Sequence, residues 1–220
     1  MAAGAPAADV PGVPVAARAE RRPRIGVLAL QGAVREHLEA IRAVGGEPVA
    51  VRLPADLAEL DALILPGGES TTMRRLIDAY GLREPIRSMA RAGAPLFGTC
   101  AGMILLADRI SGGEEPVLGL LDAEIERNAY GRQLDSYETD LDVPVLGEDP
   151  VHAVFIRAPA VTSVGPGVEV LARDPQGRPI AVRQGRVLAT AFHPELTADR
   201  RFHRLLLELV NEAAAEGGRR

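Results

Sequence analysis

The stretch APLFGTCAGMILL, residues 94–106, decides the predicted fold. Its first part, 94–98, is apolar and short, as is typical of a buried strand, and a helix is expected from residue 101 to about residue 108. No linker separates the two, and glycines stand on both sides of the junction, where they permit a sharp turn. The sequence therefore predicts a strand that turns directly into a helix at Cys100.

The same alternation of strand and helix recurs along the chain. Further strands are expected at residues 24–30, 48–52, 61–65 and 186–191, and helices at 33–44, from Ser70 onward and at 198–215. This order indicates a mostly parallel central sheet with helices on both faces. Residues 117–142 and 151–184, with short alternating segments and Gly and Pro turns, predict a small antiparallel addition. A chain of this length favours one domain, which we place at 24–214 after a disordered, Ala- and Pro-rich leader at 1–23.

The composition excludes several classes of function. The net charge of -5, with both signs interspersed, gives no basic stripe for nucleic acid, and no apolar run approaches the roughly 20 residues of a membrane span. A single cysteine forms no internal disulfide, which suits the reducing cytoplasm. All 25 basic residues are Arg, so no lysine is present to form an imine with a carbonyl substrate.

Cys100 is the candidate nucleophile. The spacing Gly98-x-Cys100-x-Gly102 mirrors the Gly-x-Ser-x-Gly motif of hydrolases, in which a tight strand-to-helix turn exposes the nucleophile. The start of a helix also favours a thiolate, which is the attacking species. The alternative is a small buried side chain without reactivity, because lone cysteines often pack in this way. The flanking glycines favour the nucleophile.

A thiolate nucleophile needs a base and a group that orients the base. His193 and Glu195, two residues apart on an extended segment, can point the same way and supply both. The other three histidines are expected to pack or to be solvated, since His37 and His203 fall on helix faces and His152 near a strand start. No spacing resembles a zinc site, and neither a metal nor a cofactor is expected.

An oxyanion formed at this nucleophile would need hydrogen-bond donors. The backbone amides of Ala101, Gly67 and Gly68 are the candidates, because the Pro66-Gly67-Gly68 turn follows a buried strand. Alone, this turn would be only a strand-to-helix connection. Its occurrence together with the Cys100 turn favours the functional interpretation.

These elements, in this order, resemble the class I glutamine amidotransferases, which carry a Cys-His-Glu triad in a three-layer, flavodoxin-like α/β fold. Four stretches are similar in particular to the glutaminase subunits of pyridoxal 5'-phosphate synthases: GVLALQGAVREH from Gly26, LILPGGESTTMRRLI from Leu63, ERNAYGRQLDSYE from Glu126 and FIRAP from Phe155. The resemblance implies that the chain hydrolyses L-glutamine to L-glutamate and ammonia through a Cys100 thioester.

The resemblance also implies a binding site and a partner. The glutamine-binding positions would be Gly68, Glu69, Ser70, Arg127, Ile156 and Arg157. Gln31 would face the synthase subunit, a dodecameric ring in this family, which carries the lysine imine chemistry that this chain lacks and takes up the ammonia through a channel. Each of the charged residues in the set, Glu69 and the arginines, could equally form a surface salt bridge.

Three other enzymes and one non-enzyme share parts of this pattern. The enzymes are a glutaminase for histidine synthesis, one for anthranilate synthesis and a free-standing γ-glutamyl hydrolase, and the stretches from Glu126 and Phe155 argue against them. The non-enzyme is a silent regulatory or scaffolding subunit. It has no chemical need for Cys100, His193 and Glu195 together.

Overall fold

The central feature of the molecule is a seven-stranded sheet. The structure is a computed structural model that describes residues 21–127, 129 and 136–217, so the predicted leader up to residue 20 and much of the stretch from Glu126 lie outside the described residues. The strand order is β10 (Glu169–Arg173), β11 (Pro179–Gln184), β12 (Val187–Thr190), β4 (Leu96–Thr99), β3 (Ala62–Leu65), β1 (Arg24–Leu28) and β2 (Glu47–Val51). The strands from β12 to β2 are parallel, and β11 runs antiparallel to both of its neighbours.

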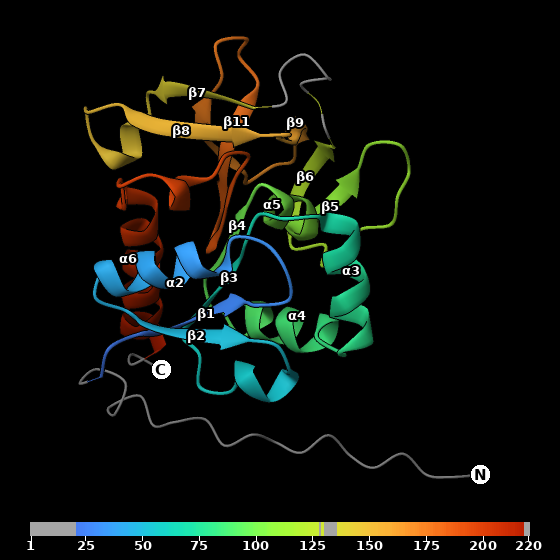
Figure 1. Cartoon of the computed structure of the whole chain (residues 1–220), viewed down its shortest axis with the longest axis vertical. Helices are drawn as coiled ribbons and strands as arrows, with labels where there is room; N and C mark the ends of the chain where they lie inside the picture. The colour runs from blue at the N-terminus through green and yellow to red at the C-terminus, as the bar shows by residue number, and fades with distance from the viewer. Residues whose placement is uncertain (1–20, 128, 130–135, 218–220) are drawn as a thin grey trace.

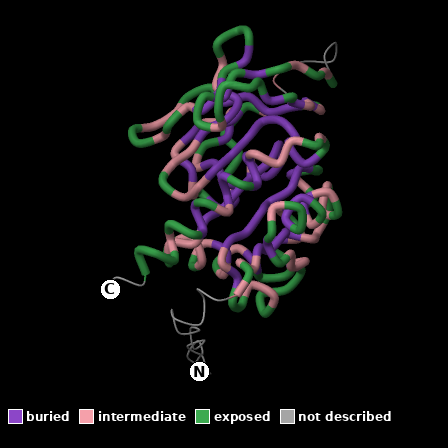
Figure 2. Tube along the Cα trace, turned by 90° about the vertical axis from the view of Figure 1, so that its left-hand side faces the viewer, coloured by how far each residue is buried: buried purple, intermediate pink, exposed green. Residues whose placement is uncertain are grey.

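Helices cover both faces of this sheet (Figure 1). On one side lie α2 (Val34–Ala43) and α6 (Arg201–Gly217), and on the other lie α3 (Ser70–Ala79), α4 (Arg83–Arg91) and α5 (Ala101–Leu106). Because helices pack on both faces, the central strands are apolar without alternation, and every residue of β3 and β4 is buried. Figure 2 shows the buried segments running through the middle of the molecule. The predicted three-layer α/β fold is confirmed.

Two smaller sheets lie beside one end of the central sheet. One contains β5 (Ala107–Ile110), β6 (Leu121–Glu126) and β9 (Ala160–Val164), in which β5 and β6 are parallel and β6 and β9 antiparallel. In the other, β7 (Ser136–Leu141) pairs antiparallel with β8 (Val151–Ile156). Short 3₁₀ turns occur at η1 (Pro54–Leu57), η2 (Pro144–Leu146) and η3 (Pro194–Leu196). Among the described residues, no helix has both the length and the apolar character needed to cross a membrane.

The carboxyl ends of four parallel strands meet at one edge of the central sheet. Thr99 of β4 pairs with Thr190 of β12, and β1 and β3 end close by at Leu28 and Leu65. In open α/β sheets this edge is where ligands bind, because the loops after the strands converge there. The topology therefore brings the loops that contain Gln31, Gly67, Cys100 and His193 to one place.

Two local predictions differ from the structure. The helix expected to reach about residue 108 ends at Leu106, because residues 107–110 form β5 and pair with β6. The helix α4 has no counterpart among the predicted elements. Its segment, REPIRSMAR, contains four charged residues and a proline, and Ile86 is the residue of the helix that is buried. A helix with so narrow an apolar stripe gives a weak periodic signal.

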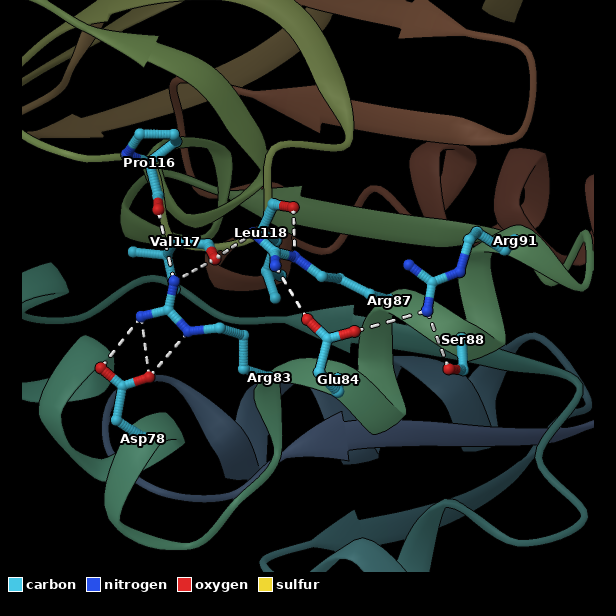
Figure 3. A network of polar contacts seen from close by, with 9 residues as sticks. All are labelled: Asp78, Arg83, Glu84, Arg87, Ser88, Arg91, Pro116, Val117 and Leu118. Carbon is cyan, nitrogen blue, oxygen red and sulfur yellow. Dashed lines mark hydrogen bonds and ion pairs between the residues drawn. The ribbon is translucent and has the colours of Figure 1, made fainter. Parts of the chain in front are cut away.

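Arginines on α4 attach this helix to the loop before β6 (Figure 3). Arg87 donates hydrogen bonds to the Leu118 carbonyl at 2.8 Å and the Val117 carbonyl at 3.2 Å, and Arg83 donates to Val117 at 2.7 Å. Asp78 accepts two hydrogen bonds from Arg83, and Glu84 accepts one from Arg87, which orients both guanidinium groups. The arginines thus satisfy carbonyl groups in a segment whose side chains are buried.

We predict that Arg87→Ala lowers the free energy of unfolding by about 1–3 kcal/mol, because the partly buried Leu118 carbonyl loses its donor, whereas Val117 keeps Arg83. Arg91→Ala is the matched control on the same helix, since Arg91 contacts the exposed Glu84 and Ser88. Its effect should stay below about 0.5 kcal/mol. Urea unfolding of both variants measures the difference, and equal losses would contradict the role given to Arg87.

Candidate active site

Cys100 lies at the turn between β4 and α5. Its backbone has φ 48° and ψ -106°, a conformation that L-residues rarely adopt and that costs on the order of 1–3 kcal/mol. The Cys100 N–H donates to the Thr190 carbonyl at 2.8 Å, which continues the pairing of β4 with β12 by one residue. The side chain lies in the wall of a cavity, and only 7% of the residue is exposed. The predicted strand-to-helix turn is present.

The flanking glycines allow close packing around this turn. A Cβ atom at Gly102 would lie 1.9 Å from the Leu65 carbonyl oxygen, and one at Gly98 would lie 2.6 Å from the Gly102 carbonyl. Neither glycine has a positive φ, so the left-handed backbone conformation belongs to Cys100 itself. The glycines let α5 approach β3 and β4 closely enough to hold Cys100 in it.

His193 and Glu195 form a buried pair beside Cys100. His193 Nδ1 lies 2.7 Å from Glu195 Oε1, and both residues are more than nine-tenths buried. The His193 N–H donates to the Val154 carbonyl of β8 at 2.9 Å, and η3 begins immediately after it. The antiparallel addition therefore fixes the position of the histidine.

The electrostatics favour a protonated His193. Burial alone would lower its pKa, but the hydrogen bonds and charges of Cys100 and Glu195 outweigh burial and raise the pKa to about 10. Glu195 is held ionised: burial acts to raise its pKa, the hydrogen bond and charge of His193 act against burial, and the pKa is lowered overall. The arrangement suits an imidazolium next to a carboxylate.

The Gly67 turn lies against this pair. A Cβ atom at Gly67 would lie 2.2 Å from His193 Cε1 and 3.3 Å from Cys100 Cβ, so a larger residue does not fit. The Gly67 N–H donates to the Thr99 hydroxyl at 3.0 Å, and the Gly67 carbonyl accepts from the Ala33 N–H at 3.1 Å. Of the three predicted oxyanion donors, Gly67 is thus already paired in this structure.

A cavity of about 400 Å³ opens over these groups, within the range for small-molecule sites. It brings together nearly all of the residues singled out in the sequence. Its lining includes Gln31, Gly67, Gly68, Glu69, Ser70, Cys100, Ala101, Arg127, Ile156, Arg157 and His193. Glu195 lies behind His193 rather than in the lining. Among the described residues, no group of three or more His, Cys, Asp or Glu side chains is arranged to hold a metal ion.

Three polar side chains of the lining already have partners. Glu69 caps α3, because its carboxylate accepts hydrogen bonds from Thr71 N at 3.0 Å and Thr72 N at 2.7 Å. Arg127 bonds both carboxylate oxygens of Glu114, at 3.0 and 3.1 Å. The Gln31 side-chain oxygen accepts the Glu69 N–H at 2.7 Å, which ties the loop after β1 to the Gly67 turn.

Residues that the sequence did not single out support the site from behind. His37 and His203 are fully buried on the facing sides of α2 and α6, and His37 also contacts Thr99, the residue before Cys100. The signal available in the sequence was a histidine within the apolar stripe of each helix, which is compatible with packing alone. His152 instead lies exposed between Asp140 and Glu138, whose hydrogen bonds raise its pKa.

Comparisons with known proteins define the class first. A crystal structure described as a glutamine amidotransferase superposes with a TM-score of 0.81 at 53% identity, covering 85% of this chain and 98% of that one. A structure of PurLQS from Thermotoga maritima, at 19% identity and a TM-score of 0.66, shares the fold. The fold is that of a glutamine amidotransferase.

The family follows from the sequence match. The model of the SNO glutamine amidotransferase family matches residues 27–212, and the chain belongs to that family. A pyridoxal 5'-phosphate synthase subunit PdxT from Frankia alni is 56% identical over 195 residues, 88% of this chain and 98% of the relative. The protein of the same name from Geobacillus kaustophilus is 56% identical over 190 residues, 86% of this chain and 96% of the relative.

We predict that the His193 ring stays protonated at neutral pH and titrates near 10, and that Cys100→Ala lowers this pKa because two of the raising interactions are lost. The pKa in the unfolded chain is about 6.5. The stabilising contribution is therefore complete below about pH 6.5 and declines as the pH rises toward 10. NMR titration of the histidines measures the His193 pKa in the wild-type protein and in Cys100→Ala. An unchanged His193 pKa in the variant would count against the Cys100 contact.

Proposed function

We propose that this chain hydrolyses L-glutamine to L-glutamate and ammonia and supplies the ammonia to the synthase subunit of a pyridoxal 5'-phosphate synthase. The single observation that carries the proposal is that Cys100, His193 and the six predicted glutamine-binding residues meet around one cavity, with Glu195 directly behind His193. The names of the relatives from Frankia and Geobacillus support the assignment of the partner.

The mechanism uses Cys100, His193 and Glu195 as a catalytic triad. The Cys100 thiolate attacks the side-chain amide carbon of glutamine, and the His193 imidazolium gives its proton to the nitrogen that leaves as ammonia. A water molecule then loses a proton to His193 and adds to the γ-glutamyl thioester, which releases glutamate and restores the Cys100 thiolate and the His193 imidazolium. Glu195 holds the ring through Nδ1, so that Nε2 performs both transfers.

The oxyanion of each tetrahedral intermediate would be held by backbone amides of Ala101 and the Gly67-Gly68 turn. In the structure of the chain alone, the Gly67 amide donates to Thr99. Full stabilisation by all three amides therefore requires the turn to change its hydrogen bonding. Binding of the synthase near Gln31, whose side chain holds this turn, is the event that we propose to bring about the change.

The substrate's charged end requires two further rearrangements. Arg127 would bind the α-carboxylate by its planar guanidinium and Glu69 the α-ammonium, each in exchange for part of its present contacts. We further propose that the active assembly is cytoplasmic, that its synthase forms a dodecameric ring, and that the glutaminase domain spans residues 24–214 after a leader at 1–23. The mass of the assembled complex tests the ring.

Replacing Cys100 by Ala should abolish glutamate release from glutamine when a pyridoxal 5'-phosphate synthase subunit is present, because no thioester can form. We expect a loss of at least about a thousandfold. Arg91→Ala, an exposed substitution away from the cavity, is the control and should keep full activity. Substantial activity in Cys100→Ala would overturn the mechanism, and wild-type activity indifferent to the synthase would overturn the partner.

Glu69 has two proposed roles, which a pair of variants separates. Glu69→Gln should raise the KM for glutamine about tenfold, because the charge that faces the α-ammonium is lost. Thr72→Val removes a hydrogen bond of the α3 cap, lies outside the cavity lining and should lower the unfolding free energy by about 0.5–2 kcal/mol with KM unchanged. If Glu69→Gln changes only the stability, the residue is a cap and does not bind substrate.

A further inference from the structure

A buried histidine that the proposed mechanism does not use lies directly behind the triad. His37 is on the face of α2 that packs against the core, and it has no exposed surface. Its Nε2 atom lies 3.1 Å from the Thr99 hydroxyl and 3.5 Å from Glu195 Oε2. Its Nδ1 atom lies 3.0 Å from His203 Nε2 on α6. The ring thus touches the residue that precedes the nucleophile and the carboxylate that orients the base.

Glu195 needs a donor on the side that faces His37. Its Oε1 atom is bonded to His193, whereas Oε2 is fully buried and has no hydrogen-bond partner among the described residues. A buried carboxylate oxygen without a donor is costly, because the charge has lost its water. The nearest candidate donor is the His37 Nε2 atom, which lies 3.5 Å from Glu195 Oε2. A small shift of either side chain would complete a hydrogen bond there.

The position of the ring proton follows from these contacts. If the proton were on Nδ1, the Nε2 lone pair would face an ionised carboxylate, and the two would repel. With the proton on Nε2, the ring donates toward Thr99 and Glu195, and His203 Nε2–H donates to the free Nδ1. Burial lowers the pKa of both histidines, that of His203 to about 3, so neither carries a charge at neutral pH.

We propose that His37 is a positioning residue of the glutaminase site, in the Nε2–H tautomer that the Glu195 carboxylate favours, and that it fixes Glu195 Oε2 and the Thr99 hydroxyl at once. The inference rests on the proposed function. Thr99 in turn accepts the Gly67 N–H, so one ring from α2 connects the triad carboxylate, the strand that carries Cys100 and the oxyanion turn. Because α2 begins just after Gln31, the ring also joins the proposed synthase-facing segment to the triad.

Two substitutions at the same position test this role. In His37→Gln the side-chain amide nitrogen reaches the place of Nε2 and can still donate to Glu195 and Thr99. In His37→Asn the amide nitrogen reaches only the place of Nδ1 and faces His203. With the synthase subunit present, we expect His37→Asn to lower kcat about tenfold to hundredfold, as loss of such outer partners does elsewhere, with KM for glutamine unchanged. His37→Gln should restore most of kcat.

A pH readout separates positioning from packing. The charged and titratable groups around His37 are Glu195 and His193 on the segment after β12, Glu36 on α2, and Arg200 and His203 next to or on α6. In His37→Asn, the His193 titration should shift, because Glu195, whose hydrogen bond and charge raise the His193 pKa, is no longer fixed. Ile41→Val, a buried change one turn along α2, is the packing control and should not shift this titration.

The outcomes distinguish this inference from the function on which it rests. The positioning role would be overturned if His37→Asn kept the kcat and the His193 titration of the wild-type protein. It would also be overturned if Ile41→Val lost as much kcat as His37→Asn. Nitrogen-15 NMR of the wild-type ring gives an answer even if the variants fail to fold: a proton on His37 Nε2 is expected, and a proton on Nδ1 overturns the proposal. A wild-type protein without glutaminase activity overturns the function instead, and the ring measurement still decides the tautomer.

Discussion

The hydrogen bond from the Cys100 N–H to the Thr190 carbonyl is the interaction on which the arrangement of the site depends. It extends the β4–β12 pairing beyond the last residue of each strand and fixes Cys100 in a left-handed backbone conformation. That conformation is unfavourable in isolation and persists because α5 is packed against β3 at Gly102. The same strand, β12, leads directly to His193, so one pair of neighbouring strands sets the distance between Cys100 and His193, the proposed nucleophile and base.

The polar groups behind Cys100 form a continuous buried layer between the sheet and the pair of helices α2 and α6. Its members are Glu195, His37, His203 and Thr99, each almost fully buried. One negative charge, that of Glu195, is therefore surrounded by two neutral rings and one protonated ring. Such a layer has few alternative hydrogen-bonding arrangements, which favours a single orientation of the side chains proposed to be catalytic.

The sequence predicted the fold, and it marked residues that the structure brings to one cavity, because these signals are local. Apolar strands alternate with helices, and Cys100 sits at a junction marked by glycines on both sides. The sequence could not predict the contact of Arg127 with Glu114, because folding brings the two residues together. The partners of Glu69 are local, but Glu is not among the residues preferred at a helix N-cap, so this contact gave no clear signal. The adjacency of His37 to Glu195 across 158 positions (195 − 37) also depends on folding and leaves no local signal. The helix α4 was missed because its attachment depends on arginines and backbone carbonyls rather than on an apolar face.

The isolation of Cys100 has a consequence for redox chemistry. It is the single thiol in the chain, and it lies in the wall of the cavity rather than in the core. When peroxide converts such a thiol to sulfenic acid, many proteins recover by forming a disulfide with a second cysteine nearby. This chain offers none, so repair must come from a small thiol that can enter the cavity, and without one oxidation continues to the irreversible sulfinic acid. A substrate that fills the cavity would protect the sulfur, because peroxide must enter the same cavity to reach it.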